Sequence, residues 1–183
     1  MSSWSTSSVL GMIGLLFVAA CAHGETCAGV ACGPGATAPR ATGTFQAKEG
    51  TDVSGTVEAI EEGNVVRLRI NLAGAPPGIH GIHIHEKGDC SAPDFSSAGG
   101  HFNPTNVAHA CPPTEPRHAG DFGNIEIAED GTGRLDVTSD HITVSPGATS
   151  VVGRSVILHH GKDDCTSQPA GDSGMRVACA VLK

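Results

Sequence analysis

The stretch Gly81-Ile82-His83-Ile84-His85-Glu86 alternates aliphatic and imidazole side chains. In a β-strand successive side chains point to opposite faces, so the two isoleucines share one face and the two histidines share the other. The isoleucines can bury in a core while both imidazoles reach a site outside that core. Because imidazole suits copper and zinc, the stretch predicts a strand that carries two neighbouring metal ligands.

More side chains of the ligand type follow this strand. They are His101 in Gly99-Gly100-His101-Phe102-Asn103-Pro104, then His109, and then His118 and Asp121 in His118-Ala119-Gly120-Asp121. Gly and Pro residues cluster between them, which predicts a long loop rather than a helix. Three imidazoles and one carboxylate make a closed tetrahedral zinc set. A further histidine, His159, ends the strand-like run Ser155-Val156-Ile157-Leu158.

The rest of the chain predicts an all-β domain. Short alternating runs recur between Gly, Pro and Asp or Asn residues, and no apolar pattern of helical period runs long enough for a helix. The predicted strands are 42–48, 53–60, 65–73, 78–86, 123–128, 133–138, 150–159 and 176–182. Eight strands in one domain predict an antiparallel sandwich or barrel. The segments 87–122 and 160–175 are too long for tight turns and are expected to be functional loops.

Taken together, these motifs resemble the copper–zinc superoxide dismutase family. The His-x-His-Glu strand, the Gly-x-His-Phe-Asn-Pro loop, the His-x-Gly-Asp motif and His159 stand in the family's order, followed by Gly174-Met175-Arg176-Val177-Ala178-Cys179. The resemblance covers about residues 41–183. It implies a flattened Greek-key barrel or sandwich of eight antiparallel strands.

The resemblance also implies one copper and one zinc per chain. The copper ligands would be His83, His85, His101 and His159, and the zinc ligands would be His101, His109, His118 and Asp121. His101 would then bridge both metals. The implied reaction is dismutation of superoxide to oxygen and hydrogen peroxide by a redox-cycling copper, with His101 supplying protons and Arg176 guiding the anion. Asp163 would join a copper histidine to a zinc histidine, which fixes the tautomers of both rings.

Two other functions compete with this interpretation. A non-catalytic copper- and zinc-binding or copper-delivery domain on the same fold usually loses copper ligands or the arginine, and here Arg176 and all ligands are present. A zinc hydrolase needs an open zinc position, whereas the predicted zinc set is closed. The formal net charge of −8 argues against nucleic-acid binding. It also requires local positive charge, from the metals, Arg176 and Lys162, to attract a superoxide anion.

The N-terminal segment 1–21 predicts export. Residues 9–20 form an apolar run that is too short to span a bilayer well and suits the h-region of a secretory signal, although residues 1–8 lack Lys and Arg. Val18-Ala19-Ala20-Cys21 is similar to a lipoprotein cleavage box, which would make Cys21 the acylated residue. Ordinary cleavage after Ala20-Cys21-Ala22 is the alternative. We therefore expect a periplasmic or cell-envelope protein that meets a membrane only through lipid.

Segment 22–40 is rich in Ala, Gly and Pro and predicts a flexible tether, after which residues 41–183 form the dismutase domain. Cys27 and Cys32 either close a small loop in the tether or stay unpaired. Four histidines lie outside the motifs and are expected to be solvated or packing side chains: His23, His80, His141 and His160. The resemblance allows a homodimer as well as a monomer.

The cysteines agree with an oxidising compartment. There are seven: Cys21, Cys27, Cys32, Cys90, Cys111, Cys165 and Cys179. If Cys21 is lipidated or removed, six remain, and six allow fifteen pairings. The resemblance implies a bond between Cys90 and Cys179. Cys111 and Cys165 then remain, one on each long loop, and a bond between them would add to the family's usual single bridge.

Overall fold

The computed structural model describes Met1 and residues 37–183 of the chain. The predicted signal peptide, the acylated Cys21, most of the tether, and Cys27 and Cys32 lie outside the described residues. The elements are β1 (Arg40–Thr44), β2 (Gln46–Ala47), β3 (Ser54–Glu62), β4 (Val65–Ala73), β5 (Gly78–His85), η1 (Ser96–Ala98), β6 (Asp121–Ile127), β7 (Gly133–Ser139), β8 (Ser155–His159) and β9 (Arg176–Val181). Within this part of the chain no helix has the length and apolar character needed to cross a membrane.

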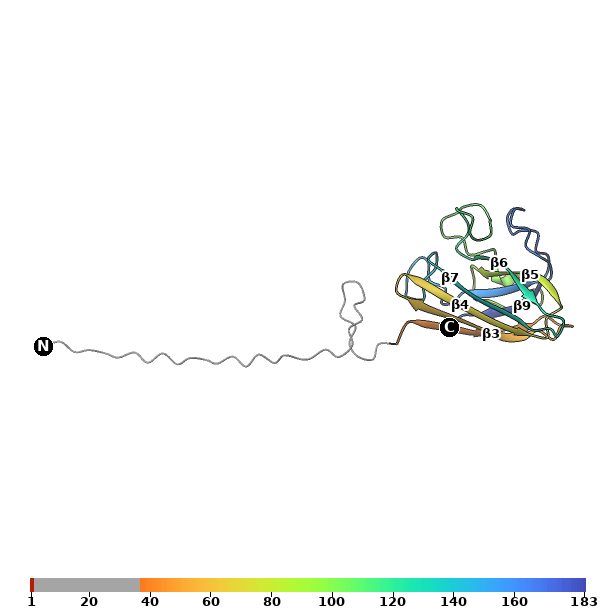
Figure 1. The fold of residues 1–183 in the computed structure, drawn as a ribbon, viewed down its shortest axis with the longest axis horizontal. Helices are drawn as coiled ribbons and strands as arrows, with labels where there is room; N and C mark the ends of the chain where they lie inside the picture. The colour runs from red at the N-terminus through yellow and green to blue at the C-terminus, as the bar shows by residue number, and fades with distance from the viewer. Residues whose placement is uncertain (2–36) are drawn as a thin grey trace. The chain divides into compact units, whose positions relative to one another are not determined.

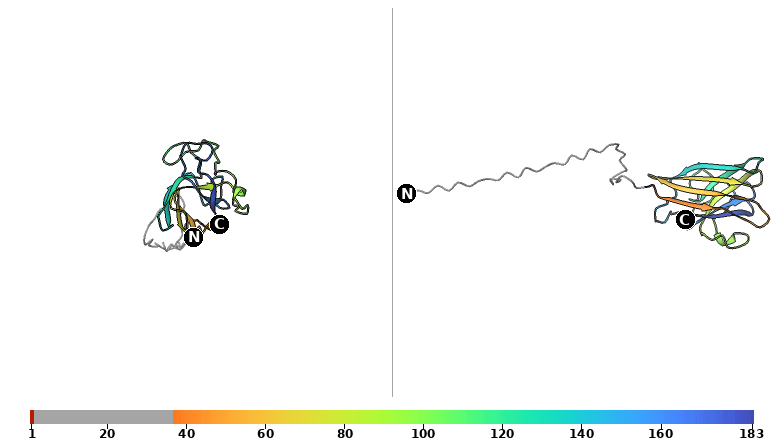
Figure 2. Two further views of the ribbon diagram at one scale, coloured as in Figure 1. Left: turned by 90° about the vertical axis from the view of Figure 1, so that its right-hand side faces the viewer. Right: turned by 90° about the horizontal axis from the view of Figure 1, so that it is seen from below.

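The strands form one antiparallel sheet in the order β1-β3-β4-β7-β6-β5-β8-β9-β2. β5, β6 and β7 follow one another and β4 lies beside β7, which is a Greek-key arrangement. Thr42 and Lys183 also exchange two backbone hydrogen bonds of 2.9 Å, so β1 meets the end of the chain and the sheet nearly closes into a barrel (Figure 2). The predicted all-β antiparallel Greek-key fold is confirmed.

The strand count is nine rather than eight, because the predicted strand 42–48 divides at Phe45. The Phe45 side chain is buried in the core, and its amide donates to Gly55. β1 before it pairs with β3, whereas β2 after it pairs with β9. The predicted strand 150–159 also begins late, at Ser155, because Arg154 closes a turn onto Val151.

Both faces of β5 are buried from His80 to His85. Ile82 and Ile84 pack in the barrel core as predicted, but His83 and His85 on the outer face are 0% and 1% exposed. The reason is that two long loops cover this face (Figure 1): the histidine loop, residues 86–120, and the C-terminal loop, residues 160–175. The site predicted outside the core is therefore closed over by loops.

The histidine loop runs back along β5. Phe102 donates to the carbonyl of Ile84, and the Ile84 amide donates to the carbonyl of Gly120. A Cβ on Gly120 would lie 2.2 Å from the Ile84 carbonyl oxygen, so this close approach requires glycine. The loop thereby carries His101 to the histidines of β5 and ends where β6 begins, at Asp121, which pairs with His83.

Candidate metal centre

Four imidazoles from three parts of the fold meet on the outer face of β5. His83 and His85 come from β5, His101 comes from the histidine loop, and His159 ends β8. All four are buried, and one ring nitrogen from each lies within 4.8 Å of those of the others. The structure thus brings together the four side chains predicted to bind copper.

A second group shares His101 with the first. Its other members are His109, His118 and Asp121, and the ligand atoms of these four residues also lie within 4.8 Å of one another. Asp121 Oδ1 is 2.8 Å from His101 Nδ1 and 3.2 Å from His118 Nδ1. This group contains the four residues predicted to bind zinc.

Hydrogen bonds to the chain fix which nitrogen of each ring faces the centre of its group. His85 Nδ1 donates to the Gly99 carbonyl at 2.9 Å and His159 Nδ1 donates to the Gly174 carbonyl at 3.2 Å. Their Nε2 atoms then face each other at 3.4 Å. In the second group His118 Nε2 donates to the Val107 carbonyl at 3.1 Å, which leaves Nδ1 free for a metal.

Three buried ring nitrogens lack a hydrogen-bond partner among the described residues: His83 Nδ1, His101 Nε2 and His109 Nδ1. His109 Nδ1 is 3.0 Å from Asp121 Oδ2, but not in hydrogen-bonding geometry. An unpartnered polar atom in a buried site is costly, and a metal ion would supply the missing partner. Copper and zinc therefore fit these residues. Nδ1 of His101 lies in the second group and its Nε2 is unpartnered, which suits a bridging imidazole.

Burial keeps several of these rings neutral at ordinary pH. It lowers the pKa of His85 to about 2, that of His159 to about 3 and that of His101 to about 4. Neutral imidazole is the form that binds one metal, so His85 and His159 need to lose no proton, whereas a ring of His101 that bridges two metals would have to lose its remaining proton. His109 differs, because the carboxylates of Asp121 and Asp163 outweigh the effect of burial and raise its pKa to about 9 in the metal-free chain.

A cavity of about 740 Å³ reaches the first group from solvent. His85, His101 and His159 line it together with Arg176 on β9. The half-buried guanidinium of Arg176 is held by two charge-assisted bonds of 2.6 Å, which it donates to the carbonyls of Phe95 and Gly99. The structure thus places a fixed cation beside the imidazoles of the first group.

Comparison with known proteins now identifies the family. A family model described as copper/zinc superoxide dismutase (SODC) matches residues 53–182. The chain belongs to this family. A relative from Aquifex aeolicus (strain VF5), superoxide dismutase [Cu-Zn] 2, is 38% identical over 137 residues, which cover 72% of this chain and 80% of the relative. The extracellular superoxide dismutase [Cu-Zn] of Brugia pahangi is 36% identical over 140 residues, which cover 72% of this chain and 69% of that protein.

A solved structure has a similar fold. The clock protein EA4 superposes with a TM-score of 0.72 at 34% identity, covering 82% of this chain and 98% of that one. The enzyme therefore dismutates superoxide, and copper and zinc are its cofactors. The family, the enzyme class and the cofactors predicted from the sequence are confirmed.

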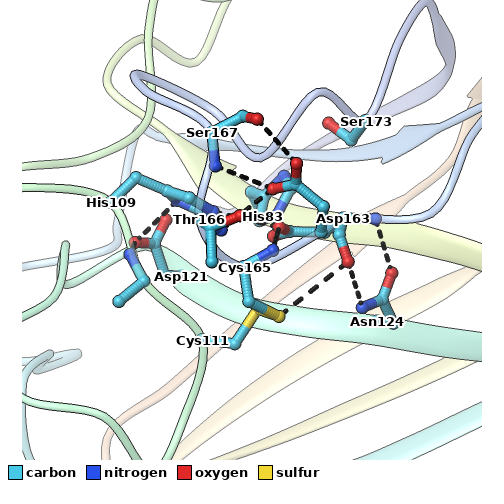
Figure 3. The surroundings of a disulfide bond; sticks show 12 residues. His83, His109, Cys111, Asp121, Asn124, Asp163, Cys165, Thr166, Ser167 and Ser173 are labelled. Carbon is cyan, nitrogen blue, oxygen red and sulfur yellow. Dashed lines mark hydrogen bonds and ion pairs between the residues drawn. A yellow bond between two sulfur atoms is a disulfide. The ribbon is translucent and has the colours of Figure 1, made fainter.

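Asp163 of the dismutase stands between the two groups (Figure 3). Its Oδ2 accepts from His83 Nε2 at 2.7 Å and its Oδ1 accepts from His109 Nε2 at 3.0 Å. The Cys165 amide also donates to Oδ1, at 2.7 Å. Burial acts to raise the pKa of Asp163, but these hydrogen bonds together hold the pKa well below its usual range. The carboxylate thus stays ionised and fixes both rings.

Two disulfides hold the loops of the dismutase, one to the barrel and one to each other. Cys90 in the histidine loop is bonded to Cys179 on β9, with a Cα–Cα distance of 5.9 Å. Cys111 in the same loop is bonded to Cys165 in the C-terminal loop, with a Cα–Cα distance of 4.9 Å. The second bond lies directly beside Asp163 (Figure 3).

Three supporting residues were not identified from the sequence. His80 was expected to be a solvated or packing side chain and is a packing one, since it is 4% exposed; the sequence did not indicate its partners, the carbonyls of His159 and Pro76, which lie 3.0 Å and 2.8 Å from its ring nitrogens. Its place on the same strand face as Ile82 was the available signal, since an imidazole in a core needs partners. The side-chain amide of Asn124 forms hydrogen bonds with both the backbone N–H and the backbone C=O of Asp163. The side-chain amide of Gln168 forms the same two bonds with the backbone of His109. No local pattern marks these two amides.

Proposed function

We propose that each chain holds one copper in the first group and one zinc in the second, bridged by His101. The supporting observation is that the two groups share His101, whose Nδ1 lies with the second group while its Nε2 is unpartnered. The ligands would be His83, His85, His101 and His159 for copper, and His101, His109, His118 and Asp121 for zinc. When bound, copper supplies the one-electron redox chemistry and zinc holds the bridging imidazole.

The chain's own residues supply binding and proton transfer. His101 Nε2 would carry the proton that passes to the reduced substrate only while it is not a copper ligand, because Nδ1 faces Asp121 and His101 lines the cavity. Arg176 raises the local concentration of the anion and offers its remaining N–H donors to it. Asp163 keeps the Nδ1 atoms of His83 and His109 directed at the metals, because it binds both Nε2 atoms.

Metal analysis joined to a superoxide-consumption assay tests these assignments. Native mass spectrometry of the fully loaded protein should show one copper and one zinc per chain. His118→Ala should lose zinc first, and His83→Ala should lose copper first. A chain that binds zinc but has no copper site would refute the assignment.

We also propose that the dismutase is exported, anchored by lipid on Cys21, and clears superoxide in the cell envelope. Segment 1–21 would be the signal, 22–40 the tether and 41–183 the enzyme domain. Export is supported by the two disulfides and by extracellular relatives from Brugia pahangi and Caenorhabditis elegans. Cys21→Ser should release the protein into the soluble periplasmic fraction. A wild type that is already soluble and begins at His23 would show ordinary cleavage instead.

The proposed enzyme is either a homodimer or a monomer in solution. Sedimentation of the metal-loaded protein would distinguish a homodimer from a monomer, and dissociation on dilution would show a weak dimer.

A further inference from the structure

We propose that Gln168 is a positioning residue that fixes the zinc ligand His109 and couples it to the wall of the substrate cavity. The inference rests on the zinc assignment made above. Gln168 lies in the C-terminal loop, 59 residues from His109 in the chain.

The Gln168 carboxamide pairs with both backbone groups of His109. The His109 amide donates to Gln168 Oε1 at 2.8 Å, and Gln168 Nε2 donates to the His109 carbonyl at 2.8 Å and to the Thr166 carbonyl at 3.2 Å. An uncharged amide side chain offers a donor and an acceptor side by side. The side chain therefore pairs with the backbone N–H and C=O of His109, as a neighbouring strand would.

His109 needs such a partner, because it lies on the histidine loop and not on a strand. Within residues 37–183 its backbone makes no hydrogen bond to other backbone. Its ring is held separately, since Nε2 donates to Asp163 Oδ1 at 3.0 Å while Nδ1 has no partner. The C-terminal loop thus holds His109 at the main chain through Gln168 and at the ring through Asp163.

Gln168 also lines the cavity that contains His159 and Arg176. The loop is pressed closely onto the zinc ligand, since a Cβ on Gly171 would lie 1.9 Å from Asp163 Oδ1 and 2.7 Å from His109 Nε2. A shift of His109 must therefore move this wall of the cavity. By the same contacts, a shift of the wall must move His109.

The second disulfide makes the role of Gln168 separable by mutation. Cys111 and Cys165 keep the two loops together two residues after His109 and three residues before Gln168. Replacing Gln168 therefore removes the hold on the His109 backbone without detaching the loop.

The test uses the full-length Gln168→Ala protein, with Ser167→Ala as the matched control. The Ser167 hydroxyl donates to Asp164 and makes no bond to His109. Zinc release into an excess of chelator should be about tenfold faster in Gln168→Ala, the lower end for a residue that supports a ligand. Ser167→Ala should release zinc at the wild-type rate. Gln168→Glu keeps an acceptor for the His109 amide but loses the donor, and should fall between wild type and Gln168→Ala.

Two further readouts separate positioning from general stability. Cobalt(II) placed at the zinc site should show shifted visible absorption bands in Gln168→Ala, because these bands report ligand geometry. In the zinc-only protein, hydrogen exchange of the His109 amide should become faster. A lowered melting temperature with unchanged cobalt bands and unchanged His109 exchange would overturn the proposal. So would wild-type zinc release in Gln168→Ala.

Failure of the zinc assignment gives a different result. If the wild type binds no zinc and His118→Ala changes nothing, the assignment fails and this inference fails with it. If the wild type binds zinc and only the Gln168 variants behave like wild type, the inference alone is wrong.

Discussion

Replacing Asp163 by Asn would remove one charge from the centre of the site while keeping the shape of the side chain. The carboxylate is 0% exposed and accepts three hydrogen bonds: from His83 Nε2 at one oxygen, and from His109 Nε2 and the Cys165 amide at the other. Asn has one acceptor oxygen. In either orientation at least one buried imidazole N–H must therefore face the amide NH₂ group.

The size of the effect follows from that unpaired donor. A buried donor without a partner costs about 1–3 kcal/mol. Because the ring cannot present its metal-facing nitrogen without that N–H, the loss falls on metal affinity, and about 1–3 kcal/mol corresponds to about 5- to 150-fold.

Zinc should bear more of the loss than copper. His83 lies on β5, where the ladder hydrogen bonds to β6 and β8 fix its backbone. His109 lies on a loop, where its backbone and ring are held by the C-terminal loop. The ligand with the weaker support should move first.

The assay compares Asp163→Asn with Asp164→Asn. Asp164 is exposed and accepts hydrogen bonds from Thr166 and Ser167. Its replacement makes the same chemical change at the next residue in the chain, which does not contact the histidines. Zinc affinity would be measured by chelator competition, and the copper site by electron paramagnetic resonance. Wild-type zinc affinity in Asp163→Asn would show that Asp163 is only a buried loop carboxylate. Loss of copper with zinc retained would refute the argument from strand and loop support.

Three further predictions concern the cavity, the second disulfide and pH. Arg176→Ile should lower the second-order rate constant with superoxide while both metals stay bound. The difference in rate from the wild type should shrink as the Debye length falls from about 10 Å at 0.1 M salt to about 3 Å at 1 M. Full activity of Arg176→Ile at low salt would contradict this prediction. Replacing Cys111 and Cys165 together by Ser should lower the unfolding free energy of the metal-free protein by about 4 kcal/mol on the loop-entropy estimate, and an unchanged denaturant midpoint would contradict it. Burial lowers the pKa of His85 to about 2 and of His159 to about 3, so between about pH 6.5 and pH 4 the unfolded chain binds protons that the folded chain does not. The melting temperature of the metal-free protein should therefore decrease as the pH is lowered from about 6.5 to about 4. A melting temperature that stays constant over this range would contradict the prediction.

The fold was predictable from the sequence where a strand's pattern is local. The alternation around His83 follows from the two-residue period of a strand, and β4 has the same bounds that its apolar pattern predicts. The division at Phe45 was not predictable in this way. It depends on where the barrel closes, and Thr42 closes it by pairing with Lys183 at the far end of the chain.

The candidate ligands were predictable because metal binding needs particular side chains at particular spacings. The hydrogen bonds that hold these ligands in place follow no such spacing in the sequence. Gln168 meets His109 across 59 residues and Asn124 meets Asp163 across 39, and an exposed glutamine or a strand asparagine carries no signal of such a partner. Sequence reasoning therefore identified the candidate ligands but not the amides that hold the backbones of His109 and Asp163.

Charge at the site is arranged so that an acidic protein can attract an anion. The chain has a formal net charge of −8, yet Asp121 and Asp163, the two carboxylates of the candidate metal centre, are 1% and 0% exposed and point their oxygens at imidazole nitrogens. Neither carboxylate lines the cavity, so an anion that enters it does not contact them. The guanidinium of Arg176 faces the cavity instead, held by two carbonyls that occupy only part of its five donors. An anion in the cavity thus meets a fixed cation with further N–H donors, while the two carboxylates that hydrogen-bond the candidate ligands lie outside the cavity lining.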